Sequence, residues 1–369
     1  MATDSILKIT EKGITGTVNE FLKSLLDKKL VQAILVPVEV KGKITLALVN
    51  SPEVLEDARP FAPYMPVSTA RMVSNMTKVS SSGKKTAVVL KSCELRALIE
   101  LVKLKQASLD NLLLIGVDCF GTFSNDNYES LCKVLTPSPA DMQEGNHPRL
   151  REACQICEYP APLNADIVIG LFGMPLDKEI LLLAETPAGE NVLAAINPGQ
   201  SNAGSVKARK KALANAISAH KKKKEEVFAR YSSEVKGLEK LQSMFASCVN
   251  CHNCRTACPL CYCRECLFDS PTFDWKADSY LGWAEKRGAL AMPSDRLLFH
   301  LTRLNHMVAS CVGCGLCQEA CPNNIEVFKI FRLTGDKVQA SLNYVPGRSL
   351  EDELPVSTFR EDELSEIGK

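Results

Sequence analysis

Two cysteine runs in the last third of the chain constrain its fold more than any other feature. Each run has the spacing C-x-x-C-x-x-C-x-x-x-C and is followed directly by proline. The first contains Cys248, Cys251, Cys254 and Cys258, and the second contains Cys311, Cys314, Cys317 and Cys321. Three thiolates at two-residue gaps can hold one iron–sulfur cubane on a tight loop, whereas the fourth cysteine ligates the other cluster. The sequence therefore predicts two [4Fe–4S] clusters in a ferredoxin-type arrangement.

The predicted ligand sets cross the two runs. The first ligand set is Cys248, Cys251, Cys254 and Cys321. The second ligand set is Cys311, Cys314, Cys317 and Cys258. Soft thiolates also suit zinc, so a pair of zinc ribbons is the alternative. Zinc sites usually combine two C-x-x-C pairs across a longer gap, which favours iron–sulfur clusters here.

The first run continues beyond Cys258 with three more cysteines, Cys261, Cys263 and Cys266. Three thiols do not complete a four-cysteine cubane. They recruit a further thiol such as Cys132, take over a ligand position, or are structural thiols, and the spacing does not choose among these roles.

The overall composition favours metal over disulfides. The chain has 16 cysteines among 369 residues, a net charge of +1 and 6% aromatic residues. Its first residues contain no apolar signal-peptide core, and no run approaches the ~18 apolar residues of a membrane span. We therefore expect a cytoplasmic protein whose thiols stay reduced, with no nucleic-acid partner and no membrane span.

Residues 1–204 read as an α/β domain with a mixed sheet. We expect a helix over 18–30, strands over 31–40, 44–49, 86–90, 112–117, 167–170 and 180–184, and a helix after Cys93. In open sheets of this kind, ligands bind beyond the carboxyl ends of the strands. Cys93 and Cys119 each follow such a strand end.

The N-terminal domain carries a cysteine set of its own. Two members, Cys93 and Cys119, follow strands, and two form the C-x-x-C of Cys154 and Cys157. The spacing alone leaves three interpretations open: a third cluster, a redox dithiol at the C-x-x-C pair, or inert buried thiols.

The remaining segments divide the rest of the chain. We expect a helical connector over 205–245, a small helical ferredoxin-like 2[4Fe–4S] module over 246–340, and a mainly acidic tail over 341–369. The tail lacks the apolar density of a core, so it is a candidate for wrapping a partner.

Five N-terminal stretches form a recognisable set: GITGTVNEFLKSLLDKKLVQAILV, KSCELRAL, LLLIGVDCFG, CQICEYPAPLNADIVIGLFG and LAETPAGENVL. Together they resemble the beta-subunit family of coenzyme F420 hydrogenases and dehydrogenases. The order of an α/β domain before a dicluster module, together with CPLCYCREC, is similar to the formate dehydrogenase beta subunits of that family.

The resemblance implies cofactors and ligands. It implies an FAD near a third [4Fe–4S] cluster, hydride exchange between the flavin and F420, and cluster ligation by Cys93, Cys119, Cys154 and Cys157. The expected cofactor-binding residues are Gly13, Thr15, Gly16, Lys91, Ser92, Asp118, Asp166, Gly170 and Gly173. Helix N-termini and a lysine at the strand ends suit a phosphate, although each glycine also has a simpler explanation as a turn residue.

The resulting interpretation is an iron–sulfur flavoprotein beta subunit. It moves electrons between a catalytic partner and a two-electron carrier, because single-electron clusters need a flavin to deliver a hydride. The partner is a formate dehydrogenase, a hydrogenase or a heterodisulfide-reductase-like complex. The alternatives are a flavin-free relay subunit and the same scaffold using ferredoxin or a nicotinamide, although no G-x-G-x-x-G fingerprint supports a nicotinamide site.

Overall fold

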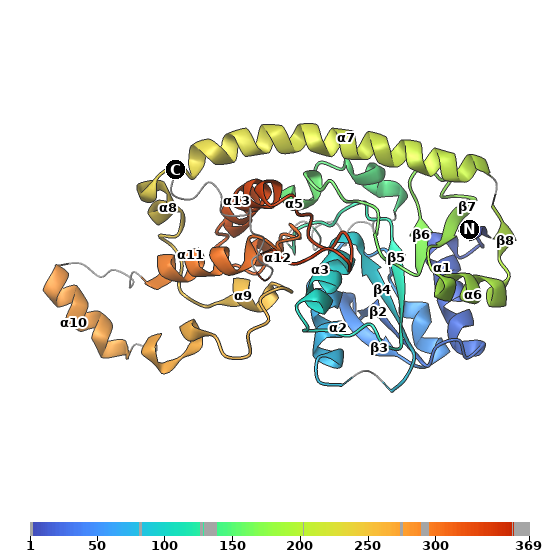
Figure 1. Cartoon of the computed structure of the whole chain (residues 1–369), viewed down its shortest axis with the longest axis horizontal. Coiled ribbons are helices and arrows are strands. Elements are labelled where there is room, and N and C mark those ends of the chain that lie inside the picture. Colours follow the sequence, from blue (N-terminus) through green and yellow to red (C-terminus); the bar gives the residue numbers. More distant parts are fainter. Residues whose placement is uncertain are drawn as a thin grey trace.

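The protein is described here by a computed structural model. It describes residues 3–80, 83–125, 128, 139–201, 203–273, 276–288, 295–355 and 357. A mixed sheet forms the N-terminal part, a group of short helices and cysteine loops forms the C-terminal part, and one long helix runs along both (Figure 1).

The sheet has eight strands in the order β3-β2-β4-β5-β6-β7-β1-β8. The strands are β1 (Thr3–Lys8), β2 (Ala33–Val40), β3 (Lys43–Val49), β4 (Thr86–Lys91), β5 (Leu112–Val117), β6 (Ile167–Gly170), β7 (Glu179–Ala184) and β8 (Gly199–Gln200). Strands β2, β4, β5 and β6 are parallel neighbours, whereas β3 and β7 are antiparallel to theirs. The predicted mixed sheet is confirmed, and all six expected strands are present.

Two strands were not predicted, β1 and β8. Strand β1 pairs antiparallel with β7 on one side and with β8 on the other. It therefore runs parallel to β6, and its carboxyl end lies at the same edge as those of β4, β5 and β6. Helix α1 (Gly13–Asp27) follows β1, so its N-terminus also lies at that edge.

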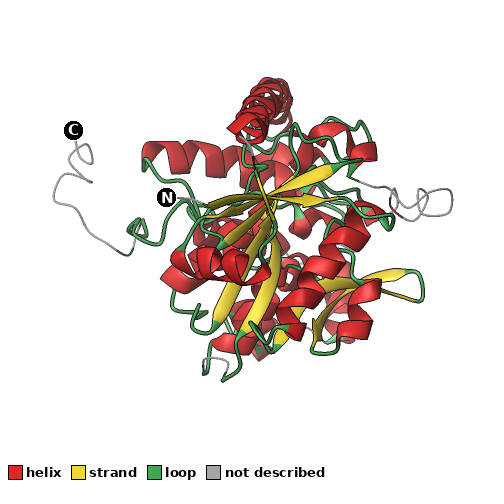
Figure 2. Cartoon of the chain, turned by 90° about the vertical axis from the view of Figure 1, so that its right-hand side faces the viewer, coloured by secondary structure: helices red, strands yellow, loops and turns green. Residues whose placement is uncertain are grey.

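Helices cover both faces of the twisted sheet (Figure 2). They include α1, α2 (Thr69–Thr77), α3 (Ser92–Lys103), α5 (Glu152–Gln155) and α6 (Pro187–Ile196). Short 3-10 turns lie at η1 (Pro52–Asp57) and η2 (Ala140–Gly145). Helix α1 begins five residues earlier than predicted because Gly13, at φ +70°, allows the chain to turn into the helix directly after β1.

The cysteine module consists of small elements around two loops. They are α8 (Leu238–Met244), α9 (Asn253–Ala257), η3 (Leu267–Asp269), η4 (Pro271–Phe273), α10 (Ala277–Arg287), α11 (Asp295–Met307), α12 (Leu316–Glu319) and α13 (Val327–Ser341). Residues of this module, including Val312, Ile330 and Phe331, share one buried apolar cluster with Leu95 and Leu98 of α3. The two halves of the chain therefore pack on a common core.

Helix α7 (Ala203–Glu234) corresponds to most of the predicted connector, but it does more than link two parts. Its 32 residues span about 48 Å. Arg209 pairs with Asp118 of the sheet domain, and Lys224 pairs with Asp336 of α13. The helix is thus fastened to both halves.

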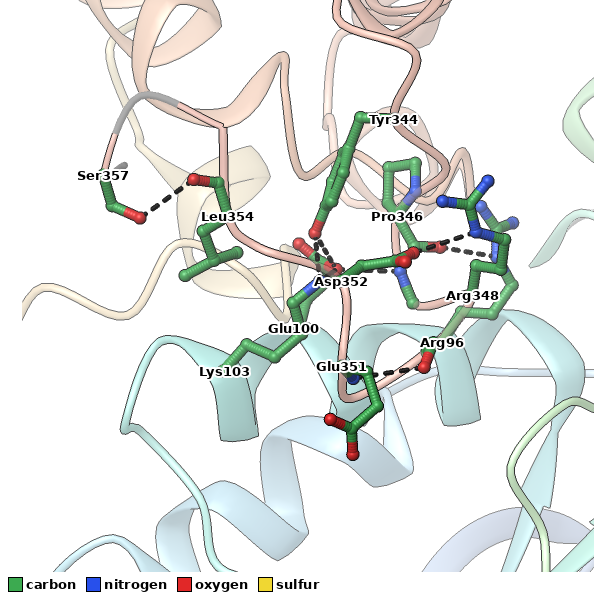
Figure 3. A network of polar contacts seen from close by, with 12 residues as sticks. Arg96, Glu100, Lys103, Tyr344, Pro346, Arg348, Glu351, Asp352, Leu354 and Ser357 are labelled. Carbon is green, nitrogen blue, oxygen red and sulfur yellow. Dashed lines mark hydrogen bonds and ion pairs between the residues drawn. The ribbon is translucent and has the colours of Figure 1, made fainter. Parts of the chain in front are cut away.

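The start of the predicted acidic tail packs on its own chain (Figure 3). Arg96 of α3 donates to the Pro346 carbonyl at 2.8 Å. The buried Glu100 accepts hydrogen bonds from the Tyr344 hydroxyl at 2.5 Å and from the Gly347 amide at 2.8 Å. Residues 342–355 therefore form a strap over α3. Nothing in the described part of the chain tests whether later tail residues contact a partner.

In the described ranges, no helix is both long and apolar enough to span a membrane.

Candidate iron–sulfur and flavin site

Four cysteines converge at the carboxyl edge of the sheet. Cys93 lies in the first turn of α3, directly after β4, and Cys119 follows β5, the parallel neighbour of β4. Cys154 lies in α5 and Cys157 just after it, and the Cys119 amide donates to the Pro160 carbonyl beyond them at 2.8 Å. We call Cys93, Cys119, Cys154 and Cys157 the N-terminal ligand set.

Neighbouring members of this set act on one another's acidity. Burial raises the pKa of Cys93, and Cys119 and Cys157 raise it further, while Cys154 adds to the effect of burial on the pKa of Cys119. The Thr122 amide also donates to the Cys154 sulfur at 3.3 Å. Amide donors to sulfur stabilise a thiolate and a bound cluster. The convergence is observed, while cluster ligation by these residues stays a prediction.

The members of each predicted C-terminal ligand set lie near one another. The first ligand set, Cys248, Cys251, Cys254 and Cys321, lines one small cavity. Burial raises the pKa of Cys314, and Cys258, Cys317 and Cys311 of the second ligand set raise it further. In the ranges that the structure describes, no three His, Cys, Asp or Glu side chains meet the geometry of a single-ion site.

The three ligand sets follow one another in space. Cys317 of the second set couples with Cys254 of the first. Cys314 of the second set couples with Cys93 of the N-terminal set. Backbone packing explains this second approach, because a Cβ at Gly315 would lie 2.6 Å from the Cβ of Ala153. The second ligand set therefore lies between the other two.

Burial makes these thiols poor anions when they are free. It raises the pKa of Cys119 and that of Cys317 to about 12. A thiol with such a pKa is protonated at neutral pH, and a bound metal removes that proton by supplying positive charge. The donor set, buried and rich in sulfur, fits iron–sulfur clusters.

Two separate cavities, together called the cavity system, lie at and beyond the N-terminal ligand set. A small cavity beside Cys119 is lined by Lys91, Phe61 and Pro60. The residue before Pro60, Arg59, lines a second cavity of about 710 Å³ together with Thr15 and Gly16 of α1. Ligand pockets usually enclose about 300–1,000 Å³. The larger cavity thus has the size of a cofactor site and extends along α1 from its first turn.

Four predicted cofactor contacts have packing partners within the chain, Asp118 also lines the small cavity beside Cys119, and their contact with a cofactor stays a prediction. Asp118 binds Arg209 through both carboxylate oxygens, at 2.6 and 2.8 Å. Gly170 leaves room for the same arginine, whose Cδ would lie 2.9 Å from an added Cβ, and Gly173 contacts the backbone of α7 equally closely. Asp166 precedes β6 at the opposite edge, where it accepts a hydrogen bond from the Leu114 amide at 2.8 Å.

The other predicted contacts differ in their surroundings. Ser92 is buried, and its hydroxyl donates to the Ala161 carbonyl at 2.9 Å, so it anchors the loop that carries Cys157. Lys91, Thr15 and Gly16 line the cavities, and Gly13 begins α1.

Two histidines lie close to the first ligand set. Nδ1 of His252, within the first cysteine run, lies 2.8 Å from a carboxylate oxygen of Asp269. Nε2 of His300, on α11, lies 3.4 Å from the Cys248 sulfur. Burial lowers the pKa of His300 to about 3, so the ring is neutral. The signal that could have identified His300 is its position, as a polar residue, on the buried face of α11.

The additional cysteines lie beside the module. Cys261 is partly buried against the core that contains the second ligand set, and the Arg71 side chain donates to its carbonyl at 3.2 Å. Cys263 is exposed, whereas Cys266 packs near Cys254. Cys132 lies outside the described residues.

Comparisons with known proteins agree with this arrangement. A family model described as a 4Fe-4S dicluster domain matches residues 244–325. The F420-dependent formate dehydrogenase subunit beta of Methanocaldococcus jannaschii is 29% identical over 391 residues, or 96% of each chain. The resemblance to the coenzyme F420 hydrogenase and dehydrogenase beta-subunit family is confirmed. The chain is thus similar over nearly its whole length to an oxidoreductase beta subunit of this type, and its residues 244–325 match an iron–sulfur domain.

Two further similarities involve this beta-subunit family and a related complex. The F420-dependent formate dehydrogenase 1 subunit beta of Methanococcus maripaludis is 28% identical over 388 residues, or 94% of each chain. A chain from the F420-reducing [NiFe] hydrogenase complex of Methanosarcina barkeri aligns with a TM-score of 0.47 and 14% identity. That alignment covers 64% of this chain and 94% of the other.

Proposed function

We propose that this beta subunit moves electrons between a catalytic partner subunit and a two-electron carrier of the F420 type. The carrying observation is the order of its sites in space. The first and second ligand sets lead to the N-terminal ligand set, and Cys119 of that set lines the cavity system at the carboxyl edge. This spatial order is the one that a continuous series of electron-transfer sites requires.

The cysteine sets would hold three [4Fe–4S] clusters. Each set provides four soft sulfur donors, and no fifth ligand is required. The exposed Cys251 marks where the first ligand set reaches the surface. A catalytic partner would therefore exchange electrons there, and such a partner is a formate dehydrogenase, a hydrogenase or a heterodisulfide-reductase-like complex.

The cavity system would hold FAD. The first turn of α1, which has no side-chain cap, lines the larger cavity together with Lys12 and Lys23. Lys12 is paired with Glu20 at 3.2 Å, so Lys23 is the cation that best suits the diphosphate there. Lys91 is 7% exposed beside Cys119, which suits the electron-rich edge of the ring system. A bound flavin supplies the conversion between single electrons and a hydride, while the chain's residues position and shield it.

Anaerobically purified full-length protein tests this proposal. Three clusters predict about twelve irons per chain, and denaturation should release a fluorescent flavin. The reconstituted protein should then oxidise reduced F420 with a viologen acceptor. Flavin without F420 turnover would change the carrier to ferredoxin or a nicotinamide, and iron without any flavin would contradict the hydride role and support a relay subunit.

A further inference from the structure

Helix α11 places one arginine inside the dicluster module. Phe299, His300, Arg303 and Met307 form the buried face of this helix. Arg303 is 4% exposed, and its guanidinium carbon lies 4.6 Å from the ring centroid of Phe331 on α13. The sequence gives no motif that singles out this residue.

The guanidinium of Arg303 lacks the partners that a buried cation requires. Its Nε and Nη1 atoms are buried, and neither has a hydrogen-bond acceptor in the described part of the chain. The described residues also offer it no carboxylate within ion-pair distance. Isolated burial of a charge is strongly unfavourable, so the counter-charge must come from something that binds here.

The neighbouring groups identify that counter-charge. The buried face of α11 packs on cysteines of both ligand sets, because Phe299 lies in one apolar cluster with Cys254 and Cys317, and Met307 lies in another with Cys258. The thiolates of these three cysteines raise the pKa of Arg303 against the effect of its burial. It therefore lies between the two sets. A cluster held by four thiolates is an anion with exposed sulfur acceptors, and it supplies both the charge and the hydrogen-bond acceptors that are missing.

We propose that Arg303 is a shared cation between the two C-terminal clusters, and that its Nε and Nη1 groups donate to cluster or thiolate sulfurs. This inference rests on the part of the proposed function that assigns two clusters to the module. It does not depend on the flavin or on the carrier.

A shared cation has a specific electrical consequence. Reduction adds one negative charge to a cluster, and a nearby positive charge in a low-dielectric interior stabilises the reduced form. Arg303 therefore raises the reduction potentials of both clusters. Two other arginines of the module differ, because Arg332 is paired with Asp336 at 3.1 Å and Arg255 with Asp269 at 2.8 Å.

Three variants of the full-length protein test the proposal. Arg303→Gln removes the charge, Arg303→Lys keeps it without the planar fork, and Arg296→Gln removes the same charge from a half-exposed position on α11. The iron content of each is measured first. Midpoint potentials then come from anaerobic dithionite titrations followed by electron paramagnetic resonance.

We expect Arg303→Gln to disfavour the reduced form of each C-terminal cluster at least tenfold, which is about 59 mV for one electron. Arg303→Lys should shift both potentials by less. Among the described cysteines, Arg296 lies near Cys248 only, so Arg296→Gln should leave the potential of the second cluster unchanged and shift that of the first by less than threefold, because solvent screens its charge. A purely structural side chain would leave the potentials of a fully loaded variant unchanged.

The outcomes separate the inference from the proposed function. Too little iron in the unaltered protein contradicts the clusters themselves. Full iron in Arg303→Gln with potentials matching those of Arg296→Gln overturns the shared-cation role. If Arg303→Gln does not retain iron, Arg303→Lys decides: retained iron supports a required positive charge, whereas loss in both variants assigns Arg303 to packing and overturns the inference.

Discussion

The ion pair between Arg209 and Asp118 offers a direct measure of how α7 is held on the sheet domain. The Asp118 side chain is 0% exposed and that of Arg209 is 12% exposed. Asp118 also accepts hydrogen bonds from the amides of Leu171 and Phe172, at 2.9 and 3.3 Å. Arg209→Met would remove the cation and leave a buried carboxylate with two amide donors.

The expected loss follows from this geometry. Removing one partner of a buried pair costs about 3–5 kcal/mol. The two amides still compensate part of the charge, so we take the lower value, about 3 kcal/mol. For chains of 150–250 residues each kcal/mol lowers the melting temperature by about 2–4 °C, and a larger chain lies at the low end. We therefore expect a loss of about 6 °C.

The assay compares apparent melting temperatures under anaerobic conditions, at one scan rate and equal iron content, because cluster proteins unfold irreversibly. Lys223→Ala is the matched control on the same helix. Its pair with Glu226 is exposed, with side-chain exposures of 47% and 56%, so its loss should stay below about 1 kcal/mol. The double variant Asp118→Asn/Arg209→Met should recover stability, because it also removes the uncompensated charge.

Two results would refute this reasoning. One is an Arg209→Met protein that melts no earlier than Lys223→Ala. The other is a double variant with a melting temperature below that of Arg209→Met, as expected if the two substitutions destabilised the protein independently. An Arg209→Met protein that keeps its melting temperature but releases its flavin would instead support the predicted contact between Asp118 and the cofactor.

Three further perturbations follow from the same structure. Cys157→Ser should remove about four irons per chain while the exposed Cys263→Ser keeps the full count, and equal iron in both variants would exclude the N-terminal cluster. Thr15→Asp places a negative charge at the N-terminus of α1, so flavin affinity in fluorescence titrations should fall at least tenfold, or about 1.4 kcal/mol; unchanged affinity would put the phosphates elsewhere. At Gly347 φ is +71°, and an added Cβ would lie 2.3 Å from the Arg96 carbonyl oxygen. Gly347→Ala should therefore destabilise the strap by about 2 kcal/mol and speed hydrogen exchange across 342–355. Unchanged exchange would contradict the anchoring role of the strap.

Local chemistry explains what the sequence predicted well. A cubane on a tight loop requires thiolates at fixed short gaps, so the spacing of the two runs predicted an iron–sulfur domain before any contact was known. The central strands could be predicted equally well from the sequence, because buried parallel strands such as Leu112–Val117 are continuous apolar runs. Each of these two signals is carried by residues that are close together in the sequence.

Pairing with distant segments explains what the sequence did not show. The stretch Thr3–Lys8 has few apolar residues and becomes a strand because β7 and β8 supply its hydrogen bonds. Asp118 follows a strand end, like a ligand-binding residue, but α7 brings Arg209 to it. The sequence does not distinguish an aspartate that binds a cofactor from one that pairs with a distant arginine.

The sequence by itself therefore determined the ligands' chemistry, the order of the two parts and the sheet's central strands. Only the tertiary structure decided that Cys93 lies near Cys314, that His300 approaches a cysteine sulfur, and that Arg303 lies between two ligand sets. The physical reason is the range of the forces involved. Ligand spacing and strand patterns are local, whereas burial and electrostatic coupling depend on which distant segments the common core packs together.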